Sequence, residues 1–388
     1  MGFWPDPAAG RLRVLHIVES LELGGMERMI ATLARASAET GVQAGVMTTK
    51  RLGPVADELR AAGIPVFDAA VRTSPPDYLA FRGLARHIRG FAPDVVHTHN
   101  TAALLFGATG ARLAGVRTVV HTEHGRVFPD RTLYMVAERL VATMVWRLVG
   151  VSDAMSRALI EHEHMPRARV LTIPNGVLPP VPATPDSVHA ARASMGLAAN
   201  ARVIGVGARL VWEKGLDVLL RALPAVIRRV PETVLVIAGD GPEGPSLRAL
   251  ASELALGDRV RFLGVRSDLG TLINAFDVVT LPSLSEGLPM ALLEAMAAER
   301  PIVASRIGAM PEALDGGGAG LLIPANDVGA LAAALEELLA NPERGRALGV
   351  AARRRFDERY TAAAMARAYA VTYRRGDDSA WEFGRTTP

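Results

Sequence analysis

Short runs of β-branched and other apolar residues recur along the whole chain, with helical segments between them. The first half contains LRVLHIV, VQAGVMTT, IPVFDA, PDVVHTH, RTVVHTE and VGVS, and the second half contains ARVIGVGARL, VLVIAGDG, RVRFLG, DVVTLPS, RPIVAS and GLLIP. Strands that alternate with helices predict a parallel sheet covered by helices on both faces. The expected fold class is α/β, with doubly wound parallel sheets that bind ligands at the carboxyl ends of their strands.

The chain is long enough for two such domains. It has 388 residues, and a single domain usually has about 150 residues. A proline-rich, polar stretch at 178–190 has the composition of a linker and separates the two series of strands. We therefore predict domains at 11–180 and 195–357. The last helical stretch, within 358–375, follows the completed second sheet, and we expect it to pack back on the first domain.

Composition limits the partners of such a protein. The absence of cysteine excludes disulfides, thiol nucleophiles and cysteine-ligated metals, and it fits a cytoplasmic location. A net charge of +3 and a pI near 9.6 favour anionic partners, such as phosphorylated ligands or an acidic membrane surface. Aromatic residues make up only 5% of the chain and do not interleave with basic residues, so nucleic acid is not an expected partner.

Neither a signal peptide nor a membrane-spanning helix is expected. Residues 1–10 contain no apolar core. The longest apolar region, 133–151, is interrupted by Glu138, Arg139 and Arg147, so it falls short of the roughly 20 apolar residues that a span needs. We expect a helix at 134–148 within this region.

Glycines and histidines follow the strands of the predicted first domain. Gly24 and Gly25 come after the first strand, where they allow either a close approach to a phosphate or simply a tight turn. They do not complete the dinucleotide pattern G-x-G-x-x-G. His97, His99, His121 and His124 end two further strands.

Each of these histidines is compatible with a hydrogen-bonded packing role, but four at one sheet edge favour a polar site. We expect His97 and His99 to alternate and to point to opposite faces of the sheet. No carboxylate and histidine share helical spacing here, so a zinc site is not expected. No serine in a G-x-S-x-G pattern accompanies the histidines, so a hydrolase triad has no support.

Residues 281–305 of the second domain combine two carboxylates with a helix start. Glu286 lies on a predicted loop and Glu294 on the following helix, with seven residues between them. Pro289 favours the first turn of a helix, so the N–H groups at 290–292 should face an incoming anion. Carboxylates suit hydroxyl groups and the helix start suits a phosphate, which together describe a nucleotide sugar.

Two cations follow the first strand of the second domain. Arg209 and Lys214 lie in GARLVWEKG, and a guanidinium with a flexible ammonium suits a diphosphate. The alternative is that both are ordinary solvated surface cations. Gly241 lies in the glycine-rich turn AGDGPE, and Glu312 lies in IGAMPE after another strand.

Together these motifs resemble those of the retaining glycosyltransferases of family 4. The resemblance covers nearly all of 12–373 and depends on the order and spacing of GGME (24–27), HTH (97–99), HTEHGR (121–126), VS (151–152), IPNGV (173–177), RLVWEKG (209–215), AGDGPE (238–243) and E-x7-E (286–294). It implies the GT-B fold, in which two Rossmann-like domains face each other across a cleft. It also implies transfer of a hexose from a UDP- or GDP-linked sugar to a hydroxyl acceptor, with no bound metal or other cofactor.

The resemblance implies a role for each matching residue. Arg209 and Lys214 would hold the donor diphosphate and stabilise the leaving group, Glu294 would bind the ribose, and Glu286 would bind the transferred sugar. His121 would lie near the reacting sugar. The remaining expected substrate-binding residues are Gly24, Gly25, His99, His124, Asn175, Gly241, Leu288, Pro289, Met290 and Ala291.

Two positions depart from the family pattern. Glu299 and Arg300 stand where the family usually has a glycine that suits a left-handed helix cap. A non-glycine residue that keeps this conformation costs on the order of 1 kcal/mol, so the local backbone is open to change. Ala309 replaces a second common glycine in IGAMPE. Neither position carries one of the charges assigned above.

Other functions remain open on the sequence. A nucleotide-sugar 2-epimerase would share the architecture and consume the donor without an acceptor, and a non-catalytic sensor would bind the donor and release nothing. The acceptor is expected to be lipid-linked or a saccharide. Arginines mix with apolar residues at 82–90 and 125–147, which favours peripheral binding to an anionic inner membrane face, although ordinary amphipathic helices have the same pattern.

Overall fold

The structure is a computed structural model that describes residues 10–70, 79–125, 132–266 and 268–374. The chain forms two compact units. Unit 1 comprises Met1–Gly176 and Ala362–Pro388, and unit 2 comprises Val177–Thr361. The chain thus passes from unit 1 to unit 2 once and returns near its C-terminal end.

Unit 1 contains a seven-stranded parallel sheet in the order β3-β2-β1-β4-β5-β6-β7. Its strands are β1 (Leu12–Ser20), β2 (Val42–Arg51), β3 (Val66–Asp68), β4 (Val95–His99), β5 (Thr118–Glu123), β6 (Arg147–Gly150) and β7 (Val170–Thr172). The order reverses direction at β1 and β4, which is the point where ligands bind in doubly wound sheets.

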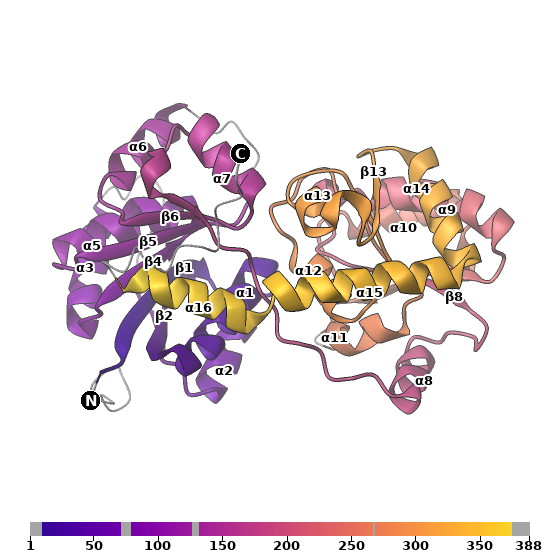
Figure 1. The fold of residues 1–388 in the computed structure, drawn as a ribbon, viewed down its shortest axis with the longest axis horizontal. Coiled ribbons are helices and arrows are strands. Elements are labelled where there is room, and N and C mark those ends of the chain that lie inside the picture. The colour runs from indigo at the N-terminus through magenta and orange to yellow at the C-terminus, as the bar shows by residue number, and fades with distance from the viewer. Residues whose placement is uncertain (1–9, 71–78, 126–131, 267, 375–388) are drawn as a thin grey trace. The chain divides into compact units, whose positions relative to one another are not determined.

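Helices cover both faces of this sheet. They are α1 (Gly25–Ala36), η1 (Ser37–Thr40), α2 (Pro54–Ala61), α3 (Ala80–Phe91), α4 (Asn100–Ala102), η2 (Ala103–Ala108), α5 (Thr109–Leu113), α6 (Thr132–Ala142), α7 (Asp153–Glu161), η3 (Arg167–Arg169) and α16 (Ala362–Tyr373). An apolar core joins α3 and η2 to the strands through residues such as Leu84, Leu104 and Val96. On the other face, α16 packs beside α1, although more than 300 residues separate them (Figure 1).

Unit 2 contains a six-stranded parallel sheet in the order β10-β9-β8-β11-β12-β13. Its strands are β8 (Arg202–Gly207), β9 (Thr233–Ala238), β10 (Val260–Gly264), β11 (Val278–Leu281), β12 (Ile302–Ser305) and β13 (Leu321–Ile323). Its helices are α8 (Pro185–Ser194), η4 (Trp212–Lys214), α9 (Leu216–Arg229), α10 (Gly244–Glu253), η5 (Gly257–Arg259), α11 (Leu269–Leu272), η6 (Ile273–Ala275), α12 (Met290–Ala297), α13 (Met310–Ala313), η7 (Asp315–Gly317), α14 (Val328–Ala340) and α15 (Pro342–Arg359).

The predicted α/β class with two doubly wound parallel sheets is confirmed. Two local predictions need correction. The helix expected at 134–148 ends at Ala142, and β6 begins at Arg147, because an apolar run does not reveal by itself where a buried helix gives way to a buried strand. The segment at 178–190 is not linker throughout, since α8 begins at Pro185 behind a Thr184 capping box.

In the described residues, no helix is both long and apolar enough to cross a bilayer. Most of the predicted arginine-rich surface at 125–147 is described from α6 onward, whereas 126–131 lies outside the described residues.

Candidate active site

The loops at the carboxyl ends of β8, β9 and β11 are joined by backbone hydrogen bonds. The N–H of Leu210 donates to the carbonyl of Asp240 at 2.9 Å, and the N–H of Leu284 donates to the carbonyl of Glu213 at 2.7 Å. The loop that carries Arg209 and Lys214 therefore lies against both the AGDGPE turn and the loop that carries Glu286. Residues far apart in the sequence are brought to one edge of the second sheet.

Glycines allow this close approach. Gly215 has a φ of +61°, and a Cβ there would lie 2.2 Å from the carbonyl oxygen of Pro282. Gly308 has a φ of +51°, and its Cβ would lie 2.2 Å from the carbonyl oxygen of Glu286. A Cβ on Gly241 would lie 2.4 Å from the carbonyl oxygen of Leu210. Since side chains do not fit at such distances, glycine is needed to hold these loops together.

Lys214 and Glu286 form an ion pair at this edge. Lys214 Nζ lies 2.5 Å from Glu286 Oε1, and the hydroxyl of Ser283 donates to the same oxygen at 2.9 Å. The side chains of Lys214 and Glu286 are 25% and 10% exposed. Arg209 is exposed nearby in sequence and makes no ion pair with the described residues. This edge of the sheet thus carries two cations, Arg209 and Lys214, and the Glu286 carboxylate. The Ser283 hydroxyl that holds the carboxylate was not among the residues predicted from the sequence.

The helix start expected after Glu286 is present. Helix α12 begins at Met290 with Pro289 as its N-cap, so the N–H groups of Met290 and Ala291 have no acceptor within the helix. The N–H of Leu292 donates to the carbonyl of Pro289 at 3.1 Å, so the expectation of a third free N–H was wrong. Glu294 lies one turn further along α12 and is half-buried. Leu288 is buried ahead of the helix.

The two departures from the family pattern have different outcomes. Glu299 takes a φ of +55°, so the left-handed conformation is kept without glycine. Ala309 takes an ordinary helical conformation with φ −83° and leads into α13.

At the carboxyl edge of the first sheet, His97 and His99 share one face. Their ring centroids lie 4.1 Å apart. The prediction of opposite faces was wrong, because side chains alternate with a period of two and residues i and i+2 of a strand point the same way. The two histidines therefore belong to one buried polar cluster that also includes His16 of β1.

Three imidazoles of this cluster form a row. His16 Nδ1 lies 3.0 Å from His99 Nε2, and His99 Nδ1 lies 2.9 Å from His124 Nε2. His16 and His99 are completely buried, and His124 is half-buried just after β5. Burial lowers the pKa of His16 to about 3 and holds the pKa of His99 well below its usual value, with neighbouring histidines adding to the effect on His99. These rings are neutral at pH 7.

His97 is held by hydroxyl groups. Its Nδ1 lies 2.8 Å from the hydroxyl of Tyr373, and its Nε2 lies 2.8 Å from that of Thr122, which in turn lies 2.8 Å from the hydroxyl of Tyr369. Both tyrosines come from α16, so the returning helix completes the polar cluster of unit 1. Burial lowers the pKa of His97 and raises the pKa of Tyr373.

His121 lies on the face of β5 opposite to that of Thr122, its neighbour in the strand. Its Nδ1 is 3.0 Å from the hydroxyl of Thr98, and its Nε2 is 4.0 Å from a carboxylate oxygen of Glu123. All three residues are almost completely buried. The sequence placed His121 and His124 at the same strand end, and the structure separates their surroundings: His121 faces a hydroxyl and a carboxylate, whereas His124 belongs to the imidazole row.

The geometry of three histidines also raises the question of a metal. One ring nitrogen from each of His16, His97 and His99 lies within 4.8 Å of the others. However, His16 and His99 are joined by a direct ring-to-ring hydrogen bond, and both nitrogens of His97 already contact hydroxyls. A metal ion would have to displace these contacts. The arrangement is therefore described better as a hydrogen-bonded cluster.

The remaining expected site residues are at strand or helix ends. Gly24 is the N-cap of α1 and Gly25 its first residue, and Asn175 is buried in the segment that leaves β7. Sequence reasoning missed Ser283, His16, Tyr369 and Tyr373. A histidine within the buried strand LRVLHIV was the one visible signal, because a polar residue there needs a partner.

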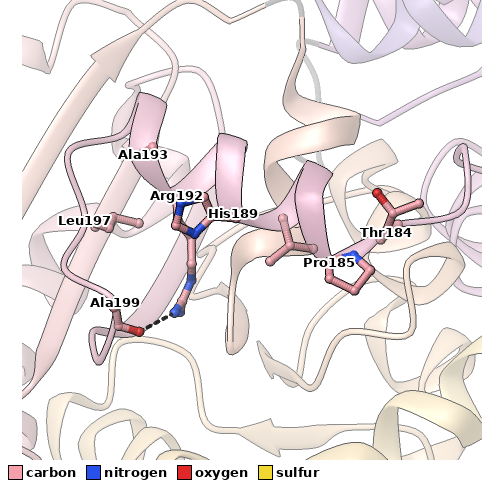
Figure 2. Close-up of a pocket in the computed structure, with 9 residues that line it drawn as sticks. Thr184, Pro185, His189, Arg192, Ala193, Leu197 and Ala199 are labelled. Carbon is pink, nitrogen blue, oxygen red and sulfur yellow. Dashed lines mark hydrogen bonds between the residues drawn. The ribbon is translucent and has the colours of Figure 1, made fainter.

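A surface hollow in unit 2 contains none of the expected site residues. Figure 2 shows it around α8, lined by residues such as Thr184, His189 and Leu197. Arg192 crosses it and donates to the carbonyl of Ala199 at 3.3 Å. Because Arg192 also binds Asp277 at 2.9 Å, its role is to fasten α8 to the sheet.

Comparisons with known proteins agree with the fold and the motifs. Residues 23–179 match the family model for glycosyltransferase family 4, and residues 201–341 match that for glycosyl transferases group 1. The D-inositol 3-phosphate glycosyltransferase of Thermobispora bispora is 31% identical, with 90% of each chain covered. The enzyme of the same name from Mycobacterium bovis is 32% identical, with 89% of this chain and 75% of that protein covered.

The fold also has relatives among solved structures. HepE of Anabaena, determined in complex with UDP, gives a TM-score of 0.81 at 22% identity, and the match covers 93% of this chain and 99% of HepE. A sucrose-phosphate synthase from Thermosynechococcus elongatus gives a TM-score of 0.77 at 22% identity, with 94% of this chain and 98% of that one covered. These neighbours have the GT-B fold. The chain is a glycosyltransferase and belongs to family 4, the glycosyl transferases group 1.

Proposed function

We propose that the protein transfers a hexose from a UDP- or GDP-linked sugar to a hydroxyl acceptor, with retention of the anomeric configuration. The observation that carries this proposal is the Lys214–Glu286 pair, which stands with Arg209 and the start of α12 at one edge of the second sheet. Cations, a carboxylate and free helix N–H groups match the diphosphate and hydroxyl groups of a sugar nucleotide. HepE is known in complex with UDP-glucose, which makes UDP-glucose the first donor to test.

In this proposal the donor is held by residues of unit 2. Arg209 and Lys214 neutralise the diphosphate, while the N–H groups of Met290 and Ala291 face one of its oxygens. Glu294 accepts hydrogen bonds from the ribose hydroxyls. Glu286, fixed by Ser283, accepts hydrogen bonds from the sugar and shares Lys214 with the diphosphate.

The chemical step generates negative charge on the leaving nucleoside diphosphate. Fixed cations near that charge stabilise the transition state more than the ground state, so Arg209 and Lys214 act as the electrophilic catalysts. The acceptor hydroxyl attacks on the face of the leaving group and passes its proton to the departing phosphate oxygen. His121 lies near the reacting sugar in this scheme. Because two side-chain cations serve the diphosphate, we propose that no metal or other cofactor is needed.

The acceptor is proposed to be a saccharide or a lipid-linked sugar. The relatives named above suggest that D-inositol 3-phosphate should be included among the acceptors tested. Three exposed arginines on α3, at 82, 86 and 89, lie near exposed Leu79 and Leu113 in unit 1. These side chains support peripheral binding to the anionic cytoplasmic face of a membrane.

The donor and the reaction class can be tested together. A thermal-shift screen of nucleotide sugars identifies the donor, and donor consumption is then followed with and without acceptors. Release of nucleoside diphosphate that requires an acceptor supports transfer, whereas conversion of the donor alone would indicate a 2-epimerase. Binding without any turnover across the acceptor screen would indicate a sensor. Unchanged transfer by the Arg209→Ala, Lys214→Ala double variant would refute the assigned chemistry.

Three finer points have separate tests. NMR of the product gives the anomeric configuration, and a β-linked product from an α-linked donor would exclude retention. Activity in excess EDTA tests metal independence. Co-sedimentation with vesicles that contain about 30 mol% phosphatidylglycerol, or phosphatidylcholine alone, tests binding to a membrane surface, since electrostatic binding needs the anionic lipid and weakens with salt.

A further inference from the structure

The C-terminal end of helix α12 is closed without the glycine that is common at such an end. Glu299 takes a left-handed conformation with a φ of +55°. Its N–H donates to the carbonyl of Met296 at 3.1 Å, and the N–H of Arg300 donates to the carbonyl of Ala295 at 3.0 Å. These two bonds form a Schellman motif, which usually has glycine at the left-handed position. Because a non-glycine residue is strained there, the surrounding contacts must hold it in place.

Two arginines bind the next two carbonyls of the same helix end. Arg353 of α15 donates through Nη1 to the carbonyl of Ala297 at 2.8 Å, and Arg300 donates through Nε to the carbonyl of Ala298 at 2.8 Å. A cation beside the last carbonyls of a helix also interacts favourably with the negative end of the helix dipole. The last turn of α12 is therefore held by its own backbone and by a side chain from a second helix.

One face of α15 lies along the segment that leaves α12. A Cβ on Gly349 would lie 2.3 Å from the carbonyl oxygen of Glu299, and a Cβ on Gly345 would lie 3.1 Å from Cγ of Pro301. Gly345, Gly349 and Arg353 are spaced by four residues, so they share this face of the helix. Glycine within a helix is less favourable than alanine. The close contact with the end of α12 explains why α15 has glycine at these positions.

The other end of α12 carries the groups that the proposed function assigns to the donor. The helix has eight residues, so its two ends are only about 12 Å apart. Most of these residues are buried, in the first turn as well as in the last. A short helix packed in this way moves as one body, because neighbouring side chains leave little room for bending. A displacement of its last turn therefore also displaces its first turn.

We propose that Arg353 and Gly349 of α15 are positioning residues for donor binding, because they fix the last turn of α12 and thereby the place of its first N–H groups and of Glu294. This inference rests on the proposed function, in which those groups hold the sugar nucleotide. The two residues act through α12 and do not touch the donor. Loss of their contacts weakens binding in the ground state and in the transition state alike, so the donor KM should rise while kcat changes little.

Arg353 and its neighbour Arg354 form a matched pair. Each faces an acid four residues further along α15, Asp357 at 2.9 Å and Glu358 at 3.6 Å, but the side chain of Arg354 is 80% exposed, whereas Arg353 also binds Ala297. Arg353→Met should raise the donor KM about fivefold and change kcat by less than about twofold. Arg354→Met should change neither. Arg353→Lys keeps a cation that can donate to the carbonyl, so it should recover most of the affinity.

Gly349→Ala displaces α12 in a second way, because the new methyl group must push the carbonyl of Glu299 away. The donor KM should rise at least as much as in Arg353→Met. Gly90→Ala in α3 is the control, since a Cβ there meets nothing within 4 Å. It should leave the donor KM unchanged.

The position of α12 can also be followed in the full chain without a ligand. Met290 and Met296 lie in its first and last turns and are buried, so ¹³C-methyl-methionine spectra report on both ends. Both signals should shift in Arg353→Met and in Gly349→Ala, and neither should shift in Arg354→Met. A shift of the Met296 signal alone would show that the displacement is not passed along the helix, which would overturn the inference.

Binding and turnover separate the remaining outcomes. If both methionine signals shift but the unaltered chain binds no sugar nucleotide, the proposed function fails, and the control of the start of α12 by Arg353 stands. If the unaltered chain is active and Arg353→Met has a lower melting temperature but an unchanged donor KM, the contact is an ordinary helix cap. That result would overturn the inference.

Discussion

The carboxyl edges of the two sheets carry different kinds of polar side chain. In unit 1 the edge consists of buried imidazoles and hydroxyls, most of them hydrogen-bonded to one another. In unit 2 it consists of partly exposed charges, with Lys214 and Glu286 paired and Arg209 exposed. Of the nine histidines, only His189 lies in Val177–Thr361.

This difference separates stability from catalysis. Buried neutral groups depend on their hydrogen-bond partners, because an unsatisfied buried polar group destabilises the fold. Exposed charges contribute little to stability, but they are available to an anionic ligand. Changes at the first edge should therefore act mainly on folding, and changes at the second mainly on the reaction.

Acid should destabilise unit 1 before unit 2. The pKa values of His16, His97, His99 and His124 in the folded chain lie below the usual value because of burial. Below about pH 6.5 the unfolded chain binds protons that the folded chain does not, so stability falls as the pH falls. Each histidine contributes up to about 1.4 kcal/mol per pH unit in this window.

Hydrogen exchange of the full chain measures this effect by region. Between pH 7 and pH 5, protection factors corrected for intrinsic exchange rates should fall by orders of magnitude in β1, β4 and β5 and much less in β8, β9 and β11. His16→Phe should reduce the loss, whereas His189→Gln serves as the control. Equal losses of protection in both sheets would contradict the predicted difference in acid stability between the two units.

Two lysine–glutamate pairs allow a direct comparison of charges. Lys214–Glu286 and Lys50–Glu19 both have N–O distances of 2.5 Å, the latter with side chains 42% and 33% exposed. Removal of one preorganised group that stabilises a transition-state charge lowers kcat by about 10²–10³-fold. We expect a loss of this size for Lys214→Ala and no change for Lys50→Ala. Lys214→Ala should also melt at a lower temperature than Lys50→Ala, because it leaves the largely buried Glu286 carboxylate without its cation. An equal effect of the two variants on steady-state rates would contradict the assignment of Lys214.

Two buried threonines test the dependence on hydrogen bonds. Thr122 and Thr280 are both completely buried in strands. The hydroxyl of Thr122 contacts His97 and Tyr369, whereas that of Thr280 has no hydrogen-bond partner among the described residues. Thr122→Val should destabilise unit 1 by about 2 kcal/mol, because it leaves two buried groups unsatisfied. Thr280→Val should be neutral or stabilising. Urea unfolding measures the free energy of unfolding of both variants. Equal losses of this free energy would show that the hydroxyl network around Thr122 adds no stability.

The same contrast explains what the sequence could predict. Alternating strands and helices predicted both sheets, because periodicity is a local property. Lys214 and Glu286 could be named from local motifs, and the resemblance placed both in one site. Ser283 could not be named, because nothing in a polar loop shows which hydroxyl meets the carboxylate. The helix at 134–148 was extended too far for the same reason, since no local signal marks its end at Ala142.

The polar cluster of unit 1 was harder to predict. His16 and His99 are 83 residues apart in the sequence, and His97 and Tyr373 are 276 residues apart. Such pairs form only when β1 and β4 become neighbours and α16 returns to the sheet. The shared face of His97 and His99 was predictable from the alternation of side chains, and the expectation to the contrary misapplied that rule.

Close backbone contacts at Gly308 help to hold the charged edge of the second sheet together. Gly308 and Gly316 have similar φ values of +51° and +63°, but a Cβ on Gly308 would lie 2.2 Å from the carbonyl oxygen of Glu286, whereas one on Gly316 meets nothing within 4 Å. Alanine at Gly316 costs about 1–2 kcal/mol for its left-handed conformation alone. Gly308→Ala carries the same cost and must also move the Glu286 loop. It should therefore melt lower than Gly316→Ala and lose affinity for the donor. If the two variants have equal donor KM and equal melting temperatures, close backbone packing is not what places Glu286, and its loop must be held by the ion pair with Lys214 and the hydrogen bonds of Ser283 and Leu284.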